Sequence, residues 1–201
     1  MVTHDCFLIK KAMANIFIIH GAFGNPDENW IPWLKIKLEN LGNKVFVPKF
    51  PTPENQTLDN WKNVFSEYEE YLDKHSVVVA HSLGPAFLLS VLESQSKPIR
   101  AAFFVAGFIS LLNNPTFDEI NKTFVEKNFN WMTIKQNCGR FYLFHSDNDP
   151  YVPISEADKL SDNLGVKSVL VKNAGHFNEQ AGFTKFDLLL DKINGELTVG
   201  D

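Results

Sequence analysis

Short apolar stretches recur along the chain, each bounded by turn-forming or polar residues. Most of them are apolar almost throughout, without the alternation of polar and apolar positions that marks a half-buried strand. Strands that are covered on both faces of a parallel sheet have this composition. The pattern predicts strands over residues 15–20, 44–50, 76–81, 99–108, 140–146 and 167–173.

Between these stretches, apolar residues recur at the spacing of amphipathic helices. The spacing predicts helices over residues 30–41, 58–72, 85–95, 117–128, 155–164 and 183–193. Because strand and helix alternate, and crossovers between parallel strands are right-handed, the helices are expected to cover both faces of the sheet. We therefore predict an α/β fold, a three-layer sandwich with a mostly or fully parallel sheet of about six strands.

A chain of 201 residues is long enough to bury one sizeable core, and no linker or repeat divides it. We expect a single domain over residues 1–201. Met13 is an alternative start, which would make residues 1–12 a dispensable or disordered extension. The sequence leaves the choice between Met1 and Met13 open.

Composition narrows the classes of function. A formal net charge of -5 and scattered lysines argue against a nucleic-acid partner. The apolar run over residues 101–112 is shorter than the roughly 20 residues of a membrane-spanning helix, so no membrane partner is expected. Without a secretory signal pattern, the expected compartment is the cytoplasm. Cys6 and Cys138 lack metal-ligand spacing and are predicted to be free thiols.

Reactive side chains follow the ends of four predicted strands. In an open α/β sheet, ligands bind in the crevice beyond the carboxyl ends of the strands. The first strand leads into HGAFGNPDENW, the third into Ser82, the fifth into SDNDPYVP and the sixth into NAGHFN. These segments are expected to meet at one edge of the sheet.

Ser82 lies in AHSLG, after a predicted strand and before a predicted helix. This is the context of a nucleophile elbow, a tight turn that exposes a serine at the edge of the sheet. The motif alone is weak, and Ser82 could instead cap the following helix. A catalytic serine also needs a base, a group that orients the base, and donors for the oxyanion.

Candidates for each of these roles are present. His176 is the candidate base, and either Asp149 or Asp147 is the candidate orienting acid; the other aspartate would make turn hydrogen bonds. The order serine, aspartate, histidine is the one found in α/β-hydrolases. Amides of Leu83 and of the loop after the first strand, at Ala22 and Phe23, are predicted to form the oxyanion hole.

Over about residues 15–193, the chain resembles the small serine hydrolases that include retinoblastoma-binding protein nine and the bacterial YdeN-like proteins, within the α/β-hydrolase superfamily. IIHGAFGNPDENW, VVVAHSLG, SDNDPYVP and GHFNEQAGF carry the resemblance. It implies an α/β-hydrolase fold with little or no lid and a triad of Ser82, Asp149 and His176, since the family aspartate lies three residues before the valine of D-x-x-V-P.

Two departures from the family pattern matter. Ala80 replaces the first glycine of G-x-S-x-G, and the residue still fits a tight turn. No L-x-C-x-E stretch is present, so the interaction with retinoblastoma protein is not transferred to this chain.

The predicted function is hydrolysis of carboxylic esters of small acyl groups, with a small-molecule ester as partner and no cofactor. Two alternatives are a peptidase or thioesterase with the same triad, and a non-catalytic or weakly catalytic interaction module on a hydrolase scaffold. No metal site is expected, and His20, His81 and His145 are interpreted as packed side chains. Oligomeric state is unreadable from the sequence. Aromatic residues that could line an apolar pocket are Phe23, Phe108, Phe117 and Trp131.

Overall fold

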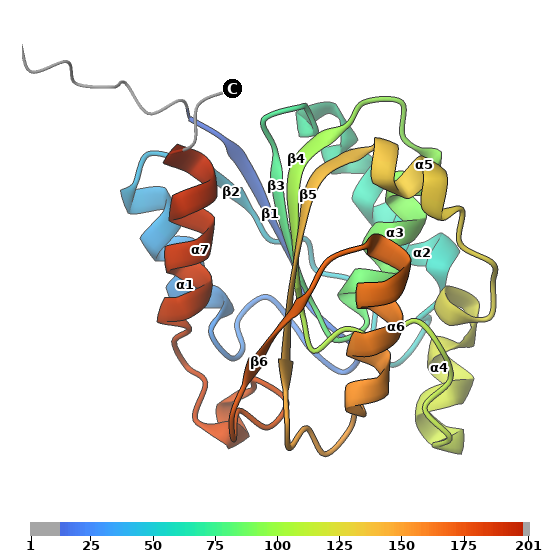
Figure 1. Cartoon of the computed structure of the whole chain (residues 1–201). Helices are drawn as coiled ribbons and strands as arrows, with labels where there is room; N and C mark the ends of the chain where they lie inside the picture. The colour runs from blue at the N-terminus through green and yellow to red at the C-terminus, as the bar shows by residue number, and fades with distance from the viewer. Residues whose placement is uncertain (1–12, 199–201) are drawn as a thin grey trace, which may run out of the picture.

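The computed structural model describes residues 13–198. A parallel six-stranded sheet runs through their centre in the order β2-β1-β3-β4-β5-β6 (Figure 1). The strands are β1 (Asn15–Ile19), β2 (Lys44–Phe46), β3 (Val77–His81), β4 (Ile99–Val105), β5 (Cys138–Ser146) and β6 (Ser168–Val171). The prediction of a three-layer α/β sandwich with a parallel sheet is confirmed.

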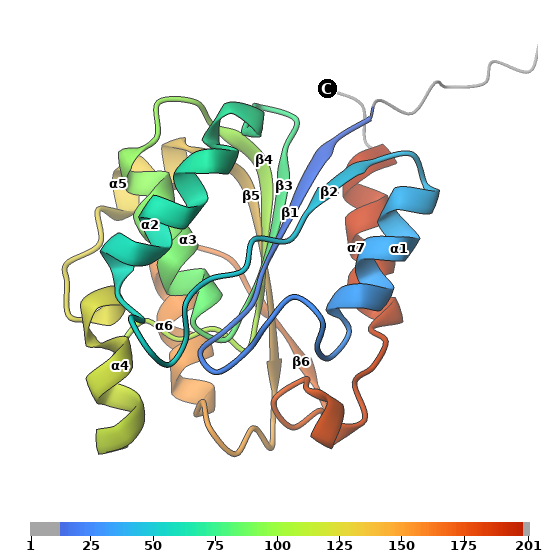
Figure 2. The same cartoon turned by 180° about the vertical axis from the view of Figure 1, so that it is seen from behind.

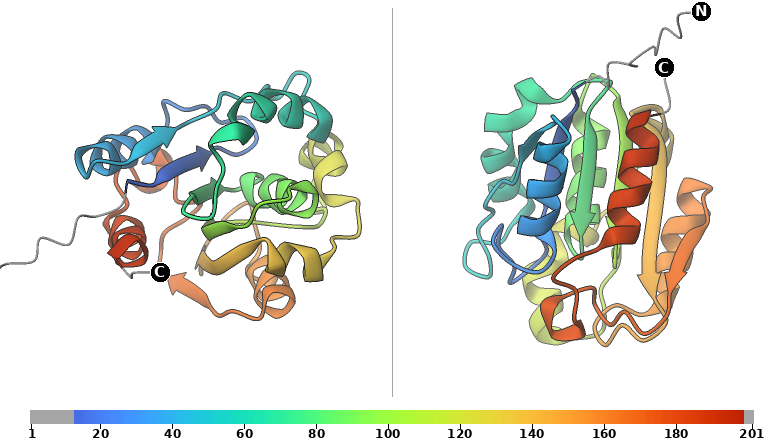
Figure 3. Two further views of the ribbon diagram at one scale, coloured as in Figure 1. Left: turned by 90° about the horizontal axis from the view of Figure 1, so that it is seen from above. Right: turned by 90° about the vertical axis from the view of Figure 1, so that its left-hand side faces the viewer.

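Helices cover both faces of this sheet. Along the described chain they are α1 (Ile31–Asn40), α2 (Leu58–Phe65), α3 (Gly84–Ser94), α4 (Pro115–Val125), α5 (Trp131–Gln136), α6 (Ile154–Leu164) and α7 (Asp187–Thr198). Helices α1 and α7 lie over one face, and the other five lie over the opposite face (Figure 2). Views from above and from the side show the same three layers (Figure 3).

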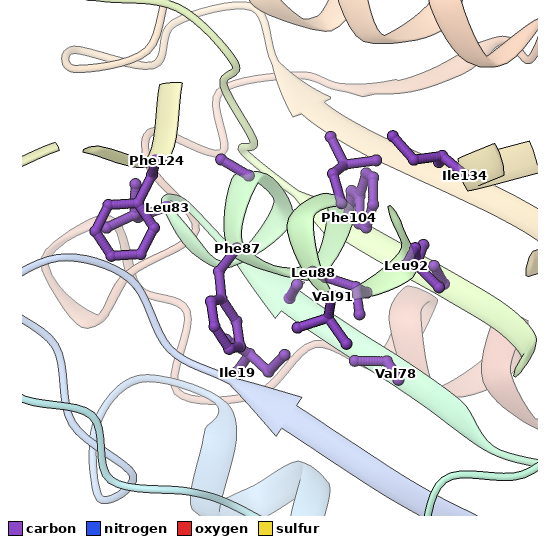
Figure 4. Close-up of a cluster of buried hydrophobic side chains, with 14 of the residues drawn as sticks. Ile19, Val78, Leu83, Phe87, Leu88, Val91, Leu92, Phe104, Phe124 and Ile134 are labelled. Atoms are coloured by element: carbon purple, nitrogen blue, oxygen red, sulfur yellow. The ribbon is translucent and has the colours of Figure 1, made fainter. Parts of the chain in front are cut away.

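Helix α3 is the central helix of its layer. Leu88, Leu89 and Leu92 are fully buried along with its other apolar residues, so the helix is apolar all round rather than amphipathic. Figure 4 shows its Phe87 and Leu88 beside Ile19 and Val78 of the sheet. This burial fixes the helix directly behind the turn that joins it to β3.

Most predicted elements are present with edges shifted by a few residues. The third predicted strand is confirmed almost to its ends, whereas β2 ends at Phe46 because the prolines after it cannot continue a strand. Residues 66–71 form a 3-10 helix rather than the end of a longer α-helix. The last helix begins at Asp187 and runs to Thr198.

One helix was missed. The connection between β4 and β5 was expected to hold a single helix, but it holds both α4 and α5. Helix α5 has only six residues, too few to show a periodic pattern, and it is set by the Asn130 side chain, which accepts a hydrogen bond from the Thr133 amide at 3.2 Å. Phe124 of α4 and Ile134 of α5 are buried in the core, so the connection forms no separate lid over the described chain.

Three further expectations concern the N-terminal extension, a membrane-spanning helix and the cysteines. The proposed extension over residues 1–12, with Cys6, lies outside the described residues. Between Met13 and Thr198, no helix is long and apolar enough to cross a membrane. Cys138 is a buried free thiol, and burial raises its pKa to about 12.

Candidate active site

Ser82 lies in the turn between β3 and α3, at the carboxyl edge of the sheet. Its φ of 59° is in the left-handed region, which is uncommon for residues other than glycine. The amide of Ser82 donates to the Val105 carbonyl at 2.9 Å, which anchors the turn to the end of β4. The N-cap of α3 is Leu83, and no side chain caps it, so Ser82 does not serve as a helix cap.

Two close approaches make this turn possible. A Cβ on Gly21 would lie 2.6 Å from the Ser82 Cβ, so the loop after β1 contacts the serine directly and only glycine fits there. A Cβ on Gly84 would lie 3.0 Å from the Ile19 carbonyl oxygen and 3.3 Å from the Ala80 Cβ. The fully buried Ala80 therefore fits the turn because position 84, beside it, carries no side chain.

The hydroxyl of Ser82 is hydrogen-bonded to an imidazole. His176 Nε2 lies 3.0 Å from Ser82 Oγ, and His176 Nδ1 lies 2.8 Å from Asp149 Oδ2. These three side chains come from the loops after β3, β5 and β6, which the parallel strands bring to one edge. In the tautomer that satisfies both bonds, Nδ1–H donates to the carboxylate and Nε2 accepts a hydrogen bond from the Ser82 hydroxyl.

Asp149 is held as a carboxylate. Its Oδ1 accepts hydrogen bonds from the amides of Tyr151 at 2.9 Å and Val152 at 3.0 Å. Burial opposes ionisation, but the hydrogen bond and charge of His176 and the two amides outweigh it and lower the pKa of Asp149. Its partner imidazole is therefore stabilised when it takes up a proton.

Asp147, the other candidate acid, has a different partner. Its Oδ1 accepts the Asn173 amide at 2.7 Å, which ties the loop after β5 to the loop after β6. The neighbouring Asn148 accepts the Gly175 amide at 2.8 Å in the same way. Asp147 is thus part of the scaffold under His176, and Asp149 is the aspartate that contacts the imidazole.

The other histidines at this edge are packed side chains with lowered pKa values. Phe50 donates its amide to His20 Nε2 at 3.1 Å, and His145 Nε2 lies 3.1 Å from the Val152 carbonyl. Burial lowers the pKa of both His20 and His145. Burial, followed by the charge of nearby His176, lowers the pKa of His81 to about 3.

His81 also contacts the candidate base, His176. Its Nε2 donates to the His176 carbonyl at 2.9 Å, and the two rings lie 4.9 Å apart. The part of the chain that the structure describes contains no group of three or more His, Cys, Asp or Glu side chains arranged to hold a metal ion.

The candidate oxyanion donors are not equivalent. Ala22 and Phe23 line the cavity beside Ser82, and Leu83 follows the serine. The Phe23 amide donates to the Thr52 hydroxyl at 2.7 Å. Ala22 and Leu83 have no amide hydrogen bond to any residue between 13 and 198. The structure therefore leaves two of the three candidate amides with a hydrogen to donate.

A cavity of about 530 Å³ lies over Ser82. Phe23 and Phe117 line one side, with ring centres 5.4 Å apart, and Tyr151 continues this side with its ring 6.3 Å from Phe117 and 5.2 Å from His176. Other lining residues are mostly polar: Glu28, Asn29, Asn178, Glu179 and Gln180.

Two aromatic residues expected in the cavity lie elsewhere. Phe108 is buried in the core, and Trp131 packs on Phe129 at the start of α5, with ring centres 5.4 Å apart. Tyr151 was missed, although it lies two residues after Asp149 in a segment that was already singled out. Its position next to the aspartate was the available signal.

Comparisons with known proteins agree with this geometry. The profile of a family described as "Serine hydrolase" matches residues 16–194. YdeN of Bacillus subtilis is 29% identical over 180 residues, which cover 89% of this chain and 93% of that protein. Serine hydrolase RBBP9 of Rattus norvegicus is 25% identical over 170 residues, covering 84% of this chain and 87% of its own length.

The fold has a close match among solved structures. The crystal structure of the ydeN gene product from B. subtilis superimposes with a TM-score of 0.87 at 27% identity, covering 93% of this chain and 100% of that one. This match confirms the predicted α/β-hydrolase fold.

Proposed function

Because the chain belongs to the serine hydrolase family, we propose that it hydrolyses carboxylic esters of small acyl groups through a Ser82–His176–Asp149 triad. One observation carries the proposal: the unbroken path of 3.0 Å from Ser82 Oγ to His176 Nε2 and 2.8 Å from His176 Nδ1 to Asp149 Oδ2. This path gives a serine hydroxyl the base that it needs near neutral pH, and gives that base a fixed orientation.

The reaction follows from these contacts. Ser82 Oγ attacks the acyl carbon while His176 Nε2 takes its proton, and the resulting imidazolium is stabilised by Asp149. His176 then donates the proton to the leaving alcohol oxygen, the carbon–oxygen bond to the alcohol breaks, and an acyl-enzyme forms on Ser82. Water then loses a proton to His176 Nε2 and its oxygen attacks the acyl carbon. The bond from this carbon to Ser82 Oγ breaks, His176 returns the proton to Ser82 Oγ, and the acid is released.

Backbone amides would hold the oxyanion of both tetrahedral intermediates. The Leu83 amide follows the nucleophile, and the Ala22 amide lies in the loop that contacts Ser82 through Gly21. Removing one such donor in other serine hydrolases lowers kcat by about a hundredfold to a thousandfold.

The cavity supports a small substrate. Its volume of about 530 Å³ must accommodate the acyl group and the leaving group together, and no lid encloses it within residues 13–198. The side formed by Phe23, Phe117 and Tyr151 is suited to an apolar group. Short acyl chains are therefore expected to react faster than long ones.

The experiment compares the wild type with Ser82→Ala. A fluorophosphonate probe is expected to label the wild type at Ser82, and a series of nitrophenyl esters from acetate to longer acyl chains is expected to give the highest kcat/KM at the short end. Ser82→Ala should neither react with the probe nor turn over the esters. Equal labelling of both proteins would refute the enzyme proposal, and a preference for long chains would refute the small-acyl assignment.

A further inference from the structure

The loop that carries the oxyanion donors is in an unfavourable backbone conformation. Phe23 has a φ of 58°, in the left-handed region that bulky residues rarely adopt. Its amide donates to Thr52 Oγ1 at 2.7 Å, across 29 residues of sequence. A loop in such a conformation keeps it only when neighbouring groups hold it there.

Thr52 is itself held in place. Its hydroxyl donates to Gln56 Oε1, so the oxygen lone pairs are left to accept the Phe23 amide. The Gln56 side chain is 5% exposed, and its Nε2 donates to Asn121 Oδ1 at 2.7 Å. A chain of hydrogen bonds thus runs from the loop after β1 to helix α4.

Helix α4 also contacts the side chain of Phe23 directly. Phe117 of this helix contacts the Phe23 ring, with the ring centres 5.4 Å apart. The backbone and the side chain of Phe23 are therefore both fixed by partners that lie far away in the sequence. The next residues toward the nucleophile are Ala22 and Gly21, and Gly21 lies directly against Ser82.

We propose that Thr52 is a positioning residue for the oxyanion hole: its hydroxyl binds the Phe23 amide and so fixes the loop in which the Ala22 amide, together with that of Leu83, faces the reacting carbonyl. This inference rests on the proposed ester hydrolysis. An amide that already donates at 2.7 Å is not available to an oxyanion, which assigns Phe23 to holding the loop and Ala22 to binding the charge.

The test compares Thr52→Val with Thr52→Ser. Valine keeps the shape of threonine but removes the acceptor, whereas serine keeps the hydroxyl and removes a methyl group. With nitrophenyl acetate, Thr52→Val is expected to lower kcat by about tenfold to a hundredfold, while KM changes by less than about threefold, because the loop acts on the transition state. Thr52→Ser is expected to stay within about threefold of the wild-type kcat.

Two further readouts separate positioning from general damage. A trifluoromethyl ketone forms an oxyanion on Ser82, so its affinity is expected to fall with kcat in Thr52→Val. Hydrogen exchange of the Phe23 amide, followed by NMR, is expected to be slow in the wild type and in Thr52→Ser, and fast in Thr52→Val. If Thr52→Val does not fold, Thr52→Ala is measured in its place with the same expected results.

Failure of the inference and failure of the proposed function give different results. An active wild type alongside a Thr52→Val variant with unchanged kcat and ketone affinity overturns the role of Thr52 alone. A Thr52→Ser variant as impaired as Thr52→Val also overturns it, because the hydroxyl would then not be the cause. A wild type without Ser82-dependent ester hydrolysis overturns the proposed function, and the role of Thr52 with it.

Discussion

Asp147 and Asp149 lie in one short loop but differ in burial and in hydrogen-bond partner. The Asp149 side chain is buried and its Oδ2 lies 2.8 Å from His176 Nδ1, whereas the exposed Asp147 accepts a backbone amide of the next loop at 2.7 Å. The difference arises because the backbone amides of Tyr151 and Val152 turn Asp149 inward. A pair of matched substitutions can therefore separate catalysis from loop structure.

Asp149→Asn is expected to lower kcat for nitrophenyl acetate by about a thousandfold or more, because the amide no longer stabilises the imidazolium and favours the wrong tautomer of His176. Asp147→Asn keeps an oxygen that can accept the Asn173 amide, so its kcat should stay within about threefold of the wild type. Steady-state kinetics on both variants test this. Equal losses would show that the loop, and not the carboxylate of Asp149, is responsible.

His81 makes the folded state sensitive to acid. Burial lowers its pKa to about 3, whereas an unfolded histidine titrates near its ordinary value. As pH falls below the unfolded value, the unfolded chain binds a proton that the folded protein does not, so stability is lost. The lowered pKa values of His20 and His145 act in the same direction.

Replacing His81 with glutamine removes this proton while keeping a side-chain N–H that can donate to the His176 carbonyl. Between about pH 7 and about pH 5, the wild type is expected to lose about 2 kcal/mol of unfolding free energy through His81 alone. Over the same pH range, the unfolding free energy of His81→Gln should fall by about 2 kcal/mol less than that of the wild type, as measured by urea unfolding at each pH. Parallel pH profiles for the two proteins would contradict the prediction.

Among the elements, the turn from β3 into α3 depends on the absence of one side chain. A Cβ on Gly84 would meet the Ile19 carbonyl oxygen at 3.0 Å, and this oxygen belongs to β1, which is paired with a strand on each side and cannot move freely. Gly84→Ala is expected to destabilise the protein by about 1–3 kcal/mol. Chemical denaturation measures this directly.

Gly195 provides the matched control. It lies in α7, and a Cβ there would meet nothing within 4 Å. Gly195→Ala is expected to leave stability unchanged or raise it by up to about 1 kcal/mol, since alanine favours the helix. Equal unfolding free energies for the two alanine variants would show that the close approach at Gly84 is relieved by small shifts.

The sequence predicts those elements that are long enough to show a clear pattern of apolar residues. Strands β3 and β4 carry uninterrupted apolar runs, over residues 77–80 and 101–105, and this marks them as central. Helix α5 and the 3-10 segment over residues 66–71 have no such signal, because one turn or two contain too few positions for a period to show. Tertiary contacts decide these segments.

The same distinction applies to the candidate site. Ser82, His176 and an aspartate of the loop after β5 could be proposed from the sequence because each follows a strand whose end must reach the same edge. The choice of Asp149 over Asp147 came from the resemblance to the family pattern D-x-x-V-P. Thr52 could not be proposed, since its contact with Phe23 depends on how a proline-rich loop folds back, and no spacing encodes that. Of the four aromatic residues predicted to line the pocket, Phe23 and Phe117 do so, whereas Phe108 and Trp131 do not. The sequence could not separate the two pairs, because aromatic residues occur in cores as well as in cavities.

At the scale of the whole molecule, the parallel sheet brings the candidate site residues to one end. The strands point to the lower edge in Figure 1, where the loops after β1, β3, β5 and β6 supply Gly21, Ser82, Asp149 and His176. The opposite edge carries a different cluster, in which Glu196 of α7 accepts from Arg140 at 3.0 Å and Tyr142 at 2.6 Å. These contacts bind α7 to β5 at the edge opposite the candidate site.

The charge around the cavity is negative, in line with the chain's formal net charge of -5. Glu28 and Glu179 line it, and none of its lining residues is lysine or arginine. Two carboxylates about 8 Å from a substrate charge would each contribute about 0.5 kcal/mol in water, so an ester that carries a carboxylate should react about fivefold more slowly than a neutral ester. An ester with a quaternary ammonium group should react faster.

Acetates of alcohols with nearly the same shape test this. Choline acetate is cationic, 3,3-dimethylbutyl acetate is its neutral counterpart, and the acetate of a hydroxy acid of similar length is anionic. The order of kcat/KM is expected to be cationic, neutral, anionic at low ionic strength, and the differences should shrink as salt screens the carboxylates. Substituting Glu28→Gln and Glu179→Gln together should compress the same order. A hydrolase that accepts the anionic ester as readily as the neutral one would place these glutamates too far from the bound substrate to act on it.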